Sequence, residues 1–82
     1  MKIWLLRPID GCDEWNPWYD KAFGFVVCAN SEQEAREAVH GNCGDEHYAM
    51  HDCPWRDPMK STCVELTADG DTRIIMRDFA AA

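Results

Sequence analysis

The sequence has no long hydrophobic run. Its N-terminal apolar stretch extends only from Ile3 to Leu6 and is closed by Arg7 and Pro8. This stretch is too short for the apolar core of a secretory signal peptide or for a membrane-spanning helix. We therefore expect a cytoplasmic protein that does not enter a membrane, in a compartment where thiols stay reduced.

Clusters of basic residues are also missing. The 82 residues include fifteen Asp and Glu but only eight Lys and Arg, which gives a formal net charge of −7 at pH 7. The basic residues stand singly along the chain, whereas binding to phosphates needs Lys and Arg grouped on one surface. We expect no direct contact with nucleic acid, and a protein partner whose own surface is basic.

The cysteines do not form a disulfide framework. There are five, and none belongs to a C-x-x-C pair, which suits reduced thiols in the cytosol. Cys and His nevertheless gather between residues 40 and 53, and both are preferred ligands of zinc. A zinc-stabilised structural protein is therefore an alternative to a polar loop that happens to be rich in His; no other cofactor is expected. The candidate metal ligands are His40, Cys43, His47, His51 and Cys53.

A catalytic signature is also absent from the sequence. The metalloprotease order H-E-x-x-H does not occur. Cys43 or Cys53 could act as a nucleophile only with a base and an oxyanion hole in reach, and no local motif indicates either. We expect a protein that is not an enzyme.

The patterns that are present predict an α+β fold. Ser31-Glu-Gln-Glu34 is a capping box that starts a helix, and Gly41-Asn42 ends it after about His40. An Asp69-Gly70 turn predicts a hairpin between the last two strands. The expected fold is a single domain in the order β-β-α-β-β, with one helix on a four-stranded, mainly antiparallel sheet. The predicted strands are residues 2–7, 22–29, 61–67 and 72–79.

One helix can cover only one face of this sheet. Ala35, Ala38 and Val39 form the narrow apolar stripe that should pack on it. The strand at 22–29 is apolar on both faces, and we place it at the centre of the sheet. An uncovered apolar face needs the two long loops with aromatic residues, at 8–20 and 41–60, a second copy or another protein to cover it, so a homodimer is a further alternative. The residues expected on that face are Trp4, Leu6, Val26 and Ile75.

Four tryptophans can serve the core or a contact surface. We favour core or lid positions for Trp4 and Trp18. Both roles stay open for Trp15 and Trp55, which lie beside prolines on acidic loops.

Acidic residues crowd the two long loops and the predicted helix. The ordinary interpretation is that they keep a small protein soluble. The more specific interpretation is a negative patch that imitates nucleic-acid phosphates and occupies a basic groove on a partner protein. The expected contacts are Asp10, Asp13, Glu14, Glu34, Glu37, Asp45 and Glu46.

Several short patterns resemble a group of small phage and prophage proteins. They are Phe25-Val-Val-Cys-Ala29, Ser31-Glu-x-Glu-Ala-Arg36, Gly44-Asp-Glu46, Pro54-Trp-Arg-Asp-Pro58, Ser61-x-Cys63-x-x-Leu66 and Arg77-Asp-Phe79. The resemblance spans most of the chain beyond the first loop, and it implies a phage origin and a ββαββ-like domain without an activity. In size and charge alone the chain is also similar to many anti-CRISPR inhibitors, which share no common fold.

Overall fold

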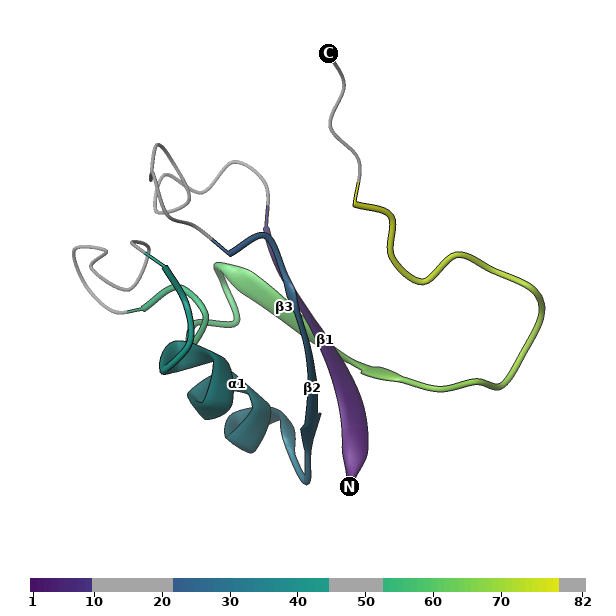
Figure 1. Cartoon of the computed structure of the whole chain (residues 1–82), viewed down its shortest axis with the longest axis horizontal. Helices are drawn as coiled ribbons and strands as arrows, with labels where there is room; N and C mark the ends of the chain where they lie inside the picture. The colour runs from purple at the N-terminus through teal and green to yellow at the C-terminus, as the bar shows by residue number, and fades with distance from the viewer. Residues whose placement is uncertain (10–21, 45–52, 79–82) are drawn as a thin grey trace, which may run out of the picture.

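The structure, a computed structural model, describes residues 1–9, 22–44 and 53–78. In this part the chain forms β1 (Lys2–Pro8), β2 (Phe25–Ala29), α1 (Glu32–His40) and β3 (Ser61–Leu66), in that order. The helix lies against one face of an antiparallel sheet (Figure 1). The predicted α+β class is thus confirmed, with three strands in the described residues.

β1 is the central strand of the sheet. The strand order is β2-β1-β3, and β1 pairs antiparallel with both neighbours. The prediction that residues 22–29 are central is wrong: the strand begins at Phe25 and lies at an edge. Apolar residues on both faces of a strand indicate only how its two faces are covered. They do not show whether one or two neighbouring strands pair with it.

The helix begins and ends where local signals predict. Ser31 is the N-cap, and its hydroxyl accepts a hydrogen bond from the Glu34 amide at 3.2 Å, which satisfies one free N–H of the first turn. Ala35 and Val39 are buried as expected. Ala38 is exposed, and the third buried position is Arg36. Arg36 directly follows Ala35 and lies three positions before Val39, so the helix presents a charged side chain beside its buried apolar residues.

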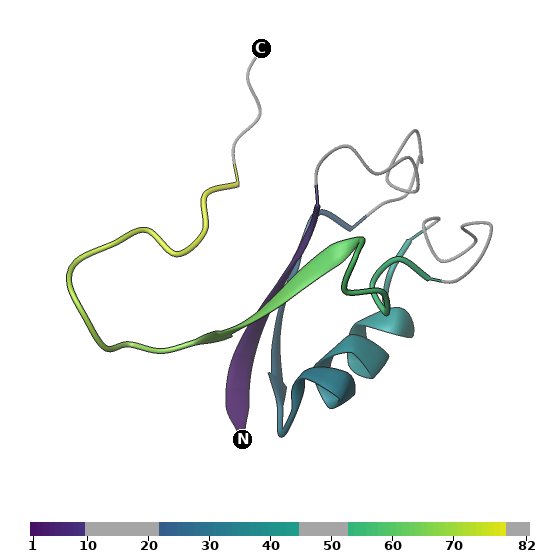
Figure 2. The same cartoon turned by 180° about the vertical axis from the view of Figure 1, so that it is seen from behind.

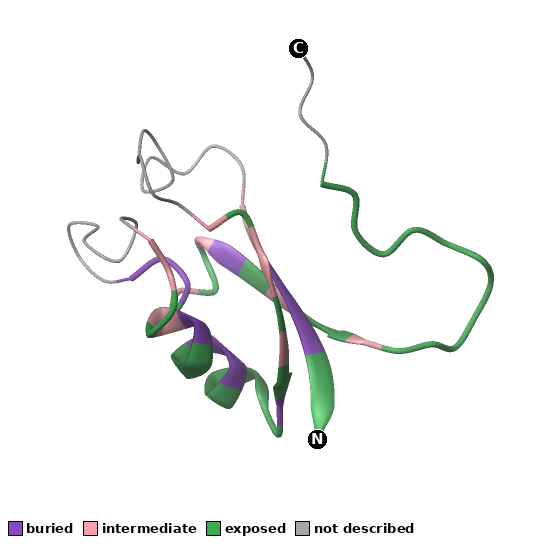
Figure 3. Cartoon of the chain, viewed as in Figure 1, coloured by how far each residue is buried: buried purple, intermediate pink, exposed green. Residues whose placement is uncertain are grey.

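The core lies between α1 and the sheet. Register places Trp4 beside Val27 and Leu6 beside Phe25, so Trp4 and Leu6 face the helix and not the open side, which corrects the prediction. Burial in the core suits Trp4, because its indole N–H donates to the Ala29 carbonyl at 3.0 Å. Figure 3 shows the buried residues gathered along the inner side of α1 and the facing strands.

Trp55 closes the core from the segment before β3. Its side chain is fully buried, and its ring meets Phe25 edge-on with centroids 5.1 Å apart. The open question between core and contact role is settled for this residue in favour of the core. Trp15 and Trp18 lie outside the described residues.

The opposite sheet face is open and apolar. Leu5 is flanked by Val26 and Val64, and the next row consists of Cys28, Ile3 and Leu66. Val26 is 61% exposed and Val64 is 54% exposed. Among the strand residues on this face, the only charged side chain is Arg7, which packs over Gly24; a Cβ there would lie 3.1 Å from the Arg7 Cδ.

The predicted fourth strand is not confirmed. Residues 72–78 are exposed and carry no strand, and Phe79 lies outside the described residues. Gly70 does take the positive φ of +100° that a turn requires. Arg73, however, donates to the carbonyls of Thr67 and Asp71 at 2.7 and 3.2 Å. These side-chain hydrogen bonds stabilise an open turn. After it the chain leads away from β3 and does not pair with it, as Figure 2 shows.

Candidate functional site

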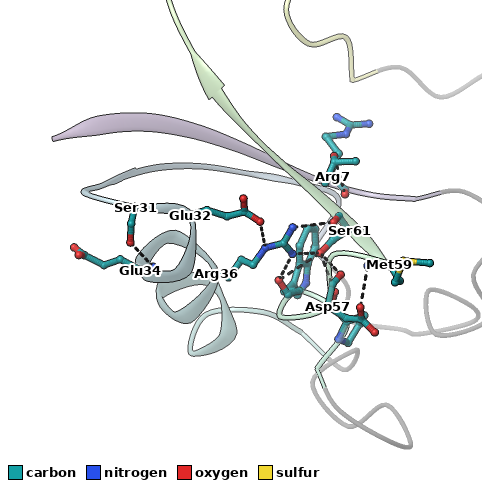
Figure 4. A network of polar contacts seen from close by, with 11 residues as sticks. Arg7, Ser31, Glu32, Glu34, Arg36, Asp57, Met59 and Ser61 are labelled. Atoms are coloured by element: carbon teal, nitrogen blue, oxygen red, sulfur yellow. Dashed lines mark hydrogen bonds and ion pairs between the residues drawn. The ribbon is translucent and has the colours of Figure 1, made fainter.

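A buried arginine joins the helix to the segment that seats Trp55. Arg36 Nη1 donates to the Trp55 carbonyl at 2.9 Å and to the Ser61 hydroxyl at 2.8 Å, and Nη2 donates to the Ser61 carbonyl at 3.0 Å (Figure 4). Nε donates to the Glu32 carboxylate at 2.9 Å, which also balances the charge. The guanidinium suits this place because its planar fork offers five donors in fixed directions.

Ser61 completes the same network. Its hydroxyl is fully buried and lies 2.9 Å from the Pro54 carbonyl, while its own amide donates to the Asp57 carbonyl at 3.0 Å. Polar groups in a core need such partners, since each one left without a hydrogen bond costs free energy. α1, residues 54–57 and the start of β3 are therefore held together by one arginine and one serine.

A shallow, open depression lies beside this network. Its volume is about 350 Å³, and it is lined by Glu32, Gln33, Arg36, Glu37, Arg56 and Pro58. Its two carboxylates pair with its two guanidinium groups, each at 2.9 Å. These residues include no nucleophile and no histidine, so what they offer is a polar contact surface and not a set of reacting groups.

The structure describes two of the seven predicted partner contacts. Glu34 and Glu37 are both exposed on α1. Glu37 accepts from Arg56 Nη2, whereas Glu34 makes no ion pair with any residue that the structure describes. Asp10, Asp13, Glu14, Asp45 and Glu46 lie outside the described residues.

The structure brings together two of the five predicted metal ligands. The sulfurs of Cys43 and Cys53 are 3.8 Å apart, and the Cys43 thiol donates to the His40 carbonyl at 3.5 Å. His47 and His51 lie outside the described residues. Across residues 1–9, 22–44 and 53–78, no three His, Cys, Asp or Glu side chains are grouped closely enough to hold a metal.

Cys63 has a perturbed thiol next to the arginine network. Its burial raises the pKa of the thiol above the usual value, the Arg36 charge opposes this and the Glu32 charge adds to it. A thiol with a raised pKa keeps its proton and is a weak nucleophile. Cys63 is therefore a structural residue at neutral pH.

Sequence reasoning missed Arg36 and Ser61 as the organising pair. The only local signal is the spacing of Glu32 and Arg36, which is typical of an exposed i,i+4 ion pair on a helix. The carbonyls that Arg36 binds lie 19 and 25 positions away, and no sequence pattern of one chain joins them.

Comparison with known proteins leaves the family open. No protein-family model matches the chain, and no match is found among the curated proteins or the solved structures that were searched. Within the described residues, no helix has the length and apolar character needed to span a membrane.

Proposed function

We propose that this chain is a non-enzymatic, acidic protein-binding module that occupies the basic, nucleic-acid-binding surface of a partner protein. In its concrete form it is a phage-encoded inhibitor of the anti-CRISPR type, which acts in the host cytosol by imitating nucleic acid. The observation that carries the proposal is the uneven exposure of charge on a chain whose formal net charge is −7.

Acidic side chains face solvent more than basic ones do. Every acidic residue that the structure describes is exposed, apart from the half-buried Asp57. Arg36 is buried and directs its donors inward, and Arg7 and Lys60 are half-buried. Among the described residues, the exposed charge is therefore more negative than their composition alone implies, and such a field attracts basic surfaces and repels phosphates.

Glu34 is the strongest of the described candidate contacts. It lies in the first turn of α1, is exposed, and has no ion pair with a described residue. Glu37 must exchange its contact with Arg56 for a cation of the partner. Because an exposed ion pair stabilises by only about 0–1 kcal/mol, this exchange costs little.

The test is affinity capture of the tagged full-length chain from bacterial lysate at low and at high salt, followed by mass spectrometry. We expect a nucleic-acid-binding complex at low salt and its loss as salt rises, because salt screens exposed charges. Capture of a partner without a basic surface, or of none at either salt concentration, contradicts the proposal.

A matched pair of variants locates the contact. Glu34→Arg with Glu37→Arg and Asp69→Arg with Asp71→Arg change the net charge equally, and all four positions are exposed. We expect the helix pair to abolish capture and the turn pair to weaken it only slightly. Equal losses from both would show that net charge acts without a defined site.

A second candidate function is favoured by the open sheet face. This face carries the rows Val26-Leu5-Val64 and Cys28-Ile3-Leu66 and no acidic strand residue, although the chain is acidic overall. A second copy could therefore pack there without bringing carboxylates of the strands together. We propose, as this alternative, a homodimeric accessory protein, in which residues 72–79 add the fourth strand of the β-β-α-β-β order.

Light scattering after size-exclusion chromatography tests the homodimer. Val64→Lys should convert dimers to monomers, because it buries a charge in the interface. Gln33→Lys, on the exposed side of α1, is the control with the same added charge. A wild-type chain that stays monomeric at high concentration rules this alternative out.

A further inference from the structure

The segment that follows β3 exposes apolar side chains, although residues 67–78 form no helix or strand. All of these residues are exposed, as Figure 3 shows. Ile74 is 79% exposed, Ile75 47% and Met76 44%. Burial of such side chains is favourable, and a run of three in contact with water is typical of a surface that binds another protein. We call residues 72–78 the arm.

The arm has the side-chain pattern of a strand. Ile74 and Met76 alternate with Arg73, Ile75 and Arg77. In an extended backbone, two apolar side chains therefore lie on one face, and two arginines flank an isoleucine on the other. The arm contains no proline or glycine, the residues that interrupt or weaken a strand. It can therefore act as a strand where it meets an open sheet edge.

β3 has such an edge. In the described part of the chain, β3 pairs with β1 alone. Its other edge thus presents backbone N–H and C=O groups to which a further strand can bind. Val64 and Leu66 lie along this edge on the open face, and Cys63 and Glu65 lie along it on the side of the helix.

The side chains of the arm and of β3 match in one orientation. With Ile74 opposite Val64 in an antiparallel pair, the apolar row of the open face continues into the arm, and Ile75 lies opposite the half-buried Cys63. The two arginines of the arm then lie on the same side as Glu65, whose side chain is 41% exposed. Opposite charges on neighbouring strands stabilise their pairing. A shift by one residue would place both arginines on the apolar face instead.

The arm does not reach the edge of its own β3. Arg73 donates to the carbonyls of Thr67 and Asp71 at 2.7 and 3.2 Å. These bonds stabilise an open turn, after which the chain leads away from β3 (Figure 2). A second copy of the chain has the same arm and the same edge, and two copies that exchange an identical element pair both edges at once.

We infer that the arm of one copy adds as a fourth strand to the outer edge of β3 in a second copy, and that the two copies exchange their arms. The inference rests on the homodimer alternative and deepens it, because it names the segment that is exchanged and the strand that receives it. Ile74 and Met76, now exposed, would then pack along the apolar row of the partner copy.

Paired cysteine substitutions in the full chain test the exchange, with Cys28→Ser in every variant to remove the exposed thiol of the open face. Residues opposite each other in antiparallel strands have Cα atoms about 4.5–5.5 Å apart, which a disulfide can span. With oxidised glutathione as the oxidant, the chain with both Val64→Cys and Ile74→Cys should form disulfide-linked dimers. Met59→Cys with Ile74→Cys is the control and should stay unlinked, since Met59 is 77% exposed and precedes β3.

Light scattering after size-exclusion chromatography gives a second measurement that needs no added cysteine. The unaltered chain should be a dimer, and Ile74→Lys should raise its dissociation constant at least about tenfold, because an isoleucine is no longer buried. Met59→Lys adds the same charge and should leave the dimer intact. Ile74 is exposed in the single chain, so neither substitution disturbs the core.

The outcomes separate the exchange from the homodimer itself. A chain that stays monomeric at every concentration would overturn both. A dimer in which the Val64→Cys, Ile74→Cys chain becomes linked within a single chain would overturn the exchange alone, because the arm would then pair with its own β3. Linking no greater than in the Met59→Cys control, or equal dissociation constants for Ile74→Lys and Met59→Lys, would also overturn the exchange.

Discussion

Arg36 connects three parts of the chain through four hydrogen bonds. It links Glu32 on its own helix to the Trp55 carbonyl and to both the hydroxyl and the carbonyl of Ser61. The side chain of Arg36 is only 8% exposed. An arginine held in this way acts as part of the core, because its removal leaves buried acceptors without donors.

Replacing Arg36 by Ala should therefore lower the free energy of unfolding by about 3 kcal/mol or more. The free energy of unfolding of Arg36→Lys should lie between those of this variant and the unaltered chain, because lysine keeps the charge but lacks the planar set of guanidinium donors. Arg56→Ala is the control, since the Arg56–Glu37 pair is exposed and contributes about 0–1 kcal/mol. Urea unfolding measures all three, and a loss in Arg36→Ala no larger than in Arg56→Ala would contradict the structural role.

Cys63 should react slowly with iodoacetamide near pH 8, while Cys28 reacts quickly. Burial raises the pKa of the Cys63 thiol, and Cys28 is exposed. The folded state holds the Cys63 thiol proton more tightly than the unfolded state does. The contribution of Cys63 to the free energy of unfolding is therefore fully present below the pKa of this thiol in the unfolded state, and it is lost as the pH rises through the pKa in the folded state. Peptide mass spectrometry measures the labelling; equal rates at the two sites would disprove the assignment.

At the scale of elements, local signals predicted the helix well. The capping box and the acidic first turn lie at one end of the helix and Gly41 at the other, each a short local pattern, and α1 spans Glu32–His40 as they indicate. Alternation likewise placed Phe25, Val27 and Ala29 on one face and Val26 and Cys28 on the other, which the register confirms. The face on which a strand residue lies can be predicted from the sequence because it depends only on the two-residue repeat of the strand backbone.

Features that depend on distant parts of the chain were not predictable in this way. The central position of β1 follows from pairing with residues at least nineteen positions away, as in the Leu6–Phe25 pair. The open turn at 67–73 depends on where the Arg73 side chain finds carbonyl acceptors, and the burial of Arg36 depends on Trp55 and Ser61. For the candidate site, the sequence singled out Cys43 and Cys53 only as members of a larger set of candidate metal ligands. It did not predict that their sulfurs are in contact.

The N-cap gives a prediction for α1 as an element. Ser31→Ala removes the acceptor of the Glu34 amide and should cost about 1 kcal/mol of stability. Ser31→Asp should retain most of it, because Asp is also a good N-cap and its charge suits the helix dipole. Thermal unfolding followed by circular dichroism tests this, and an unchanged midpoint in Ser31→Ala would refute the role of the cap.

At the scale of the whole molecule, charge and apolar surface lie on different sides. The acidic residues of α1 are on the covered side of the sheet, and the open face carries Arg7 as its one charged strand residue. Under the proposed function the first side would contact a basic partner, and in the homodimer alternative the open face would contact a second copy.

The most direct test of the central claim is a competition between this chain and nucleic acid for the captured partner. Fluorescence anisotropy of a labelled nucleic acid that the partner binds would be followed while the chain is added. The account predicts complete displacement by the unaltered chain, displacement by the Asp69→Arg, Asp71→Arg control, and none by Glu34→Arg, Glu37→Arg. A partner that binds the chain and the nucleic acid together, with neither weakening the other, would contradict nucleic-acid mimicry.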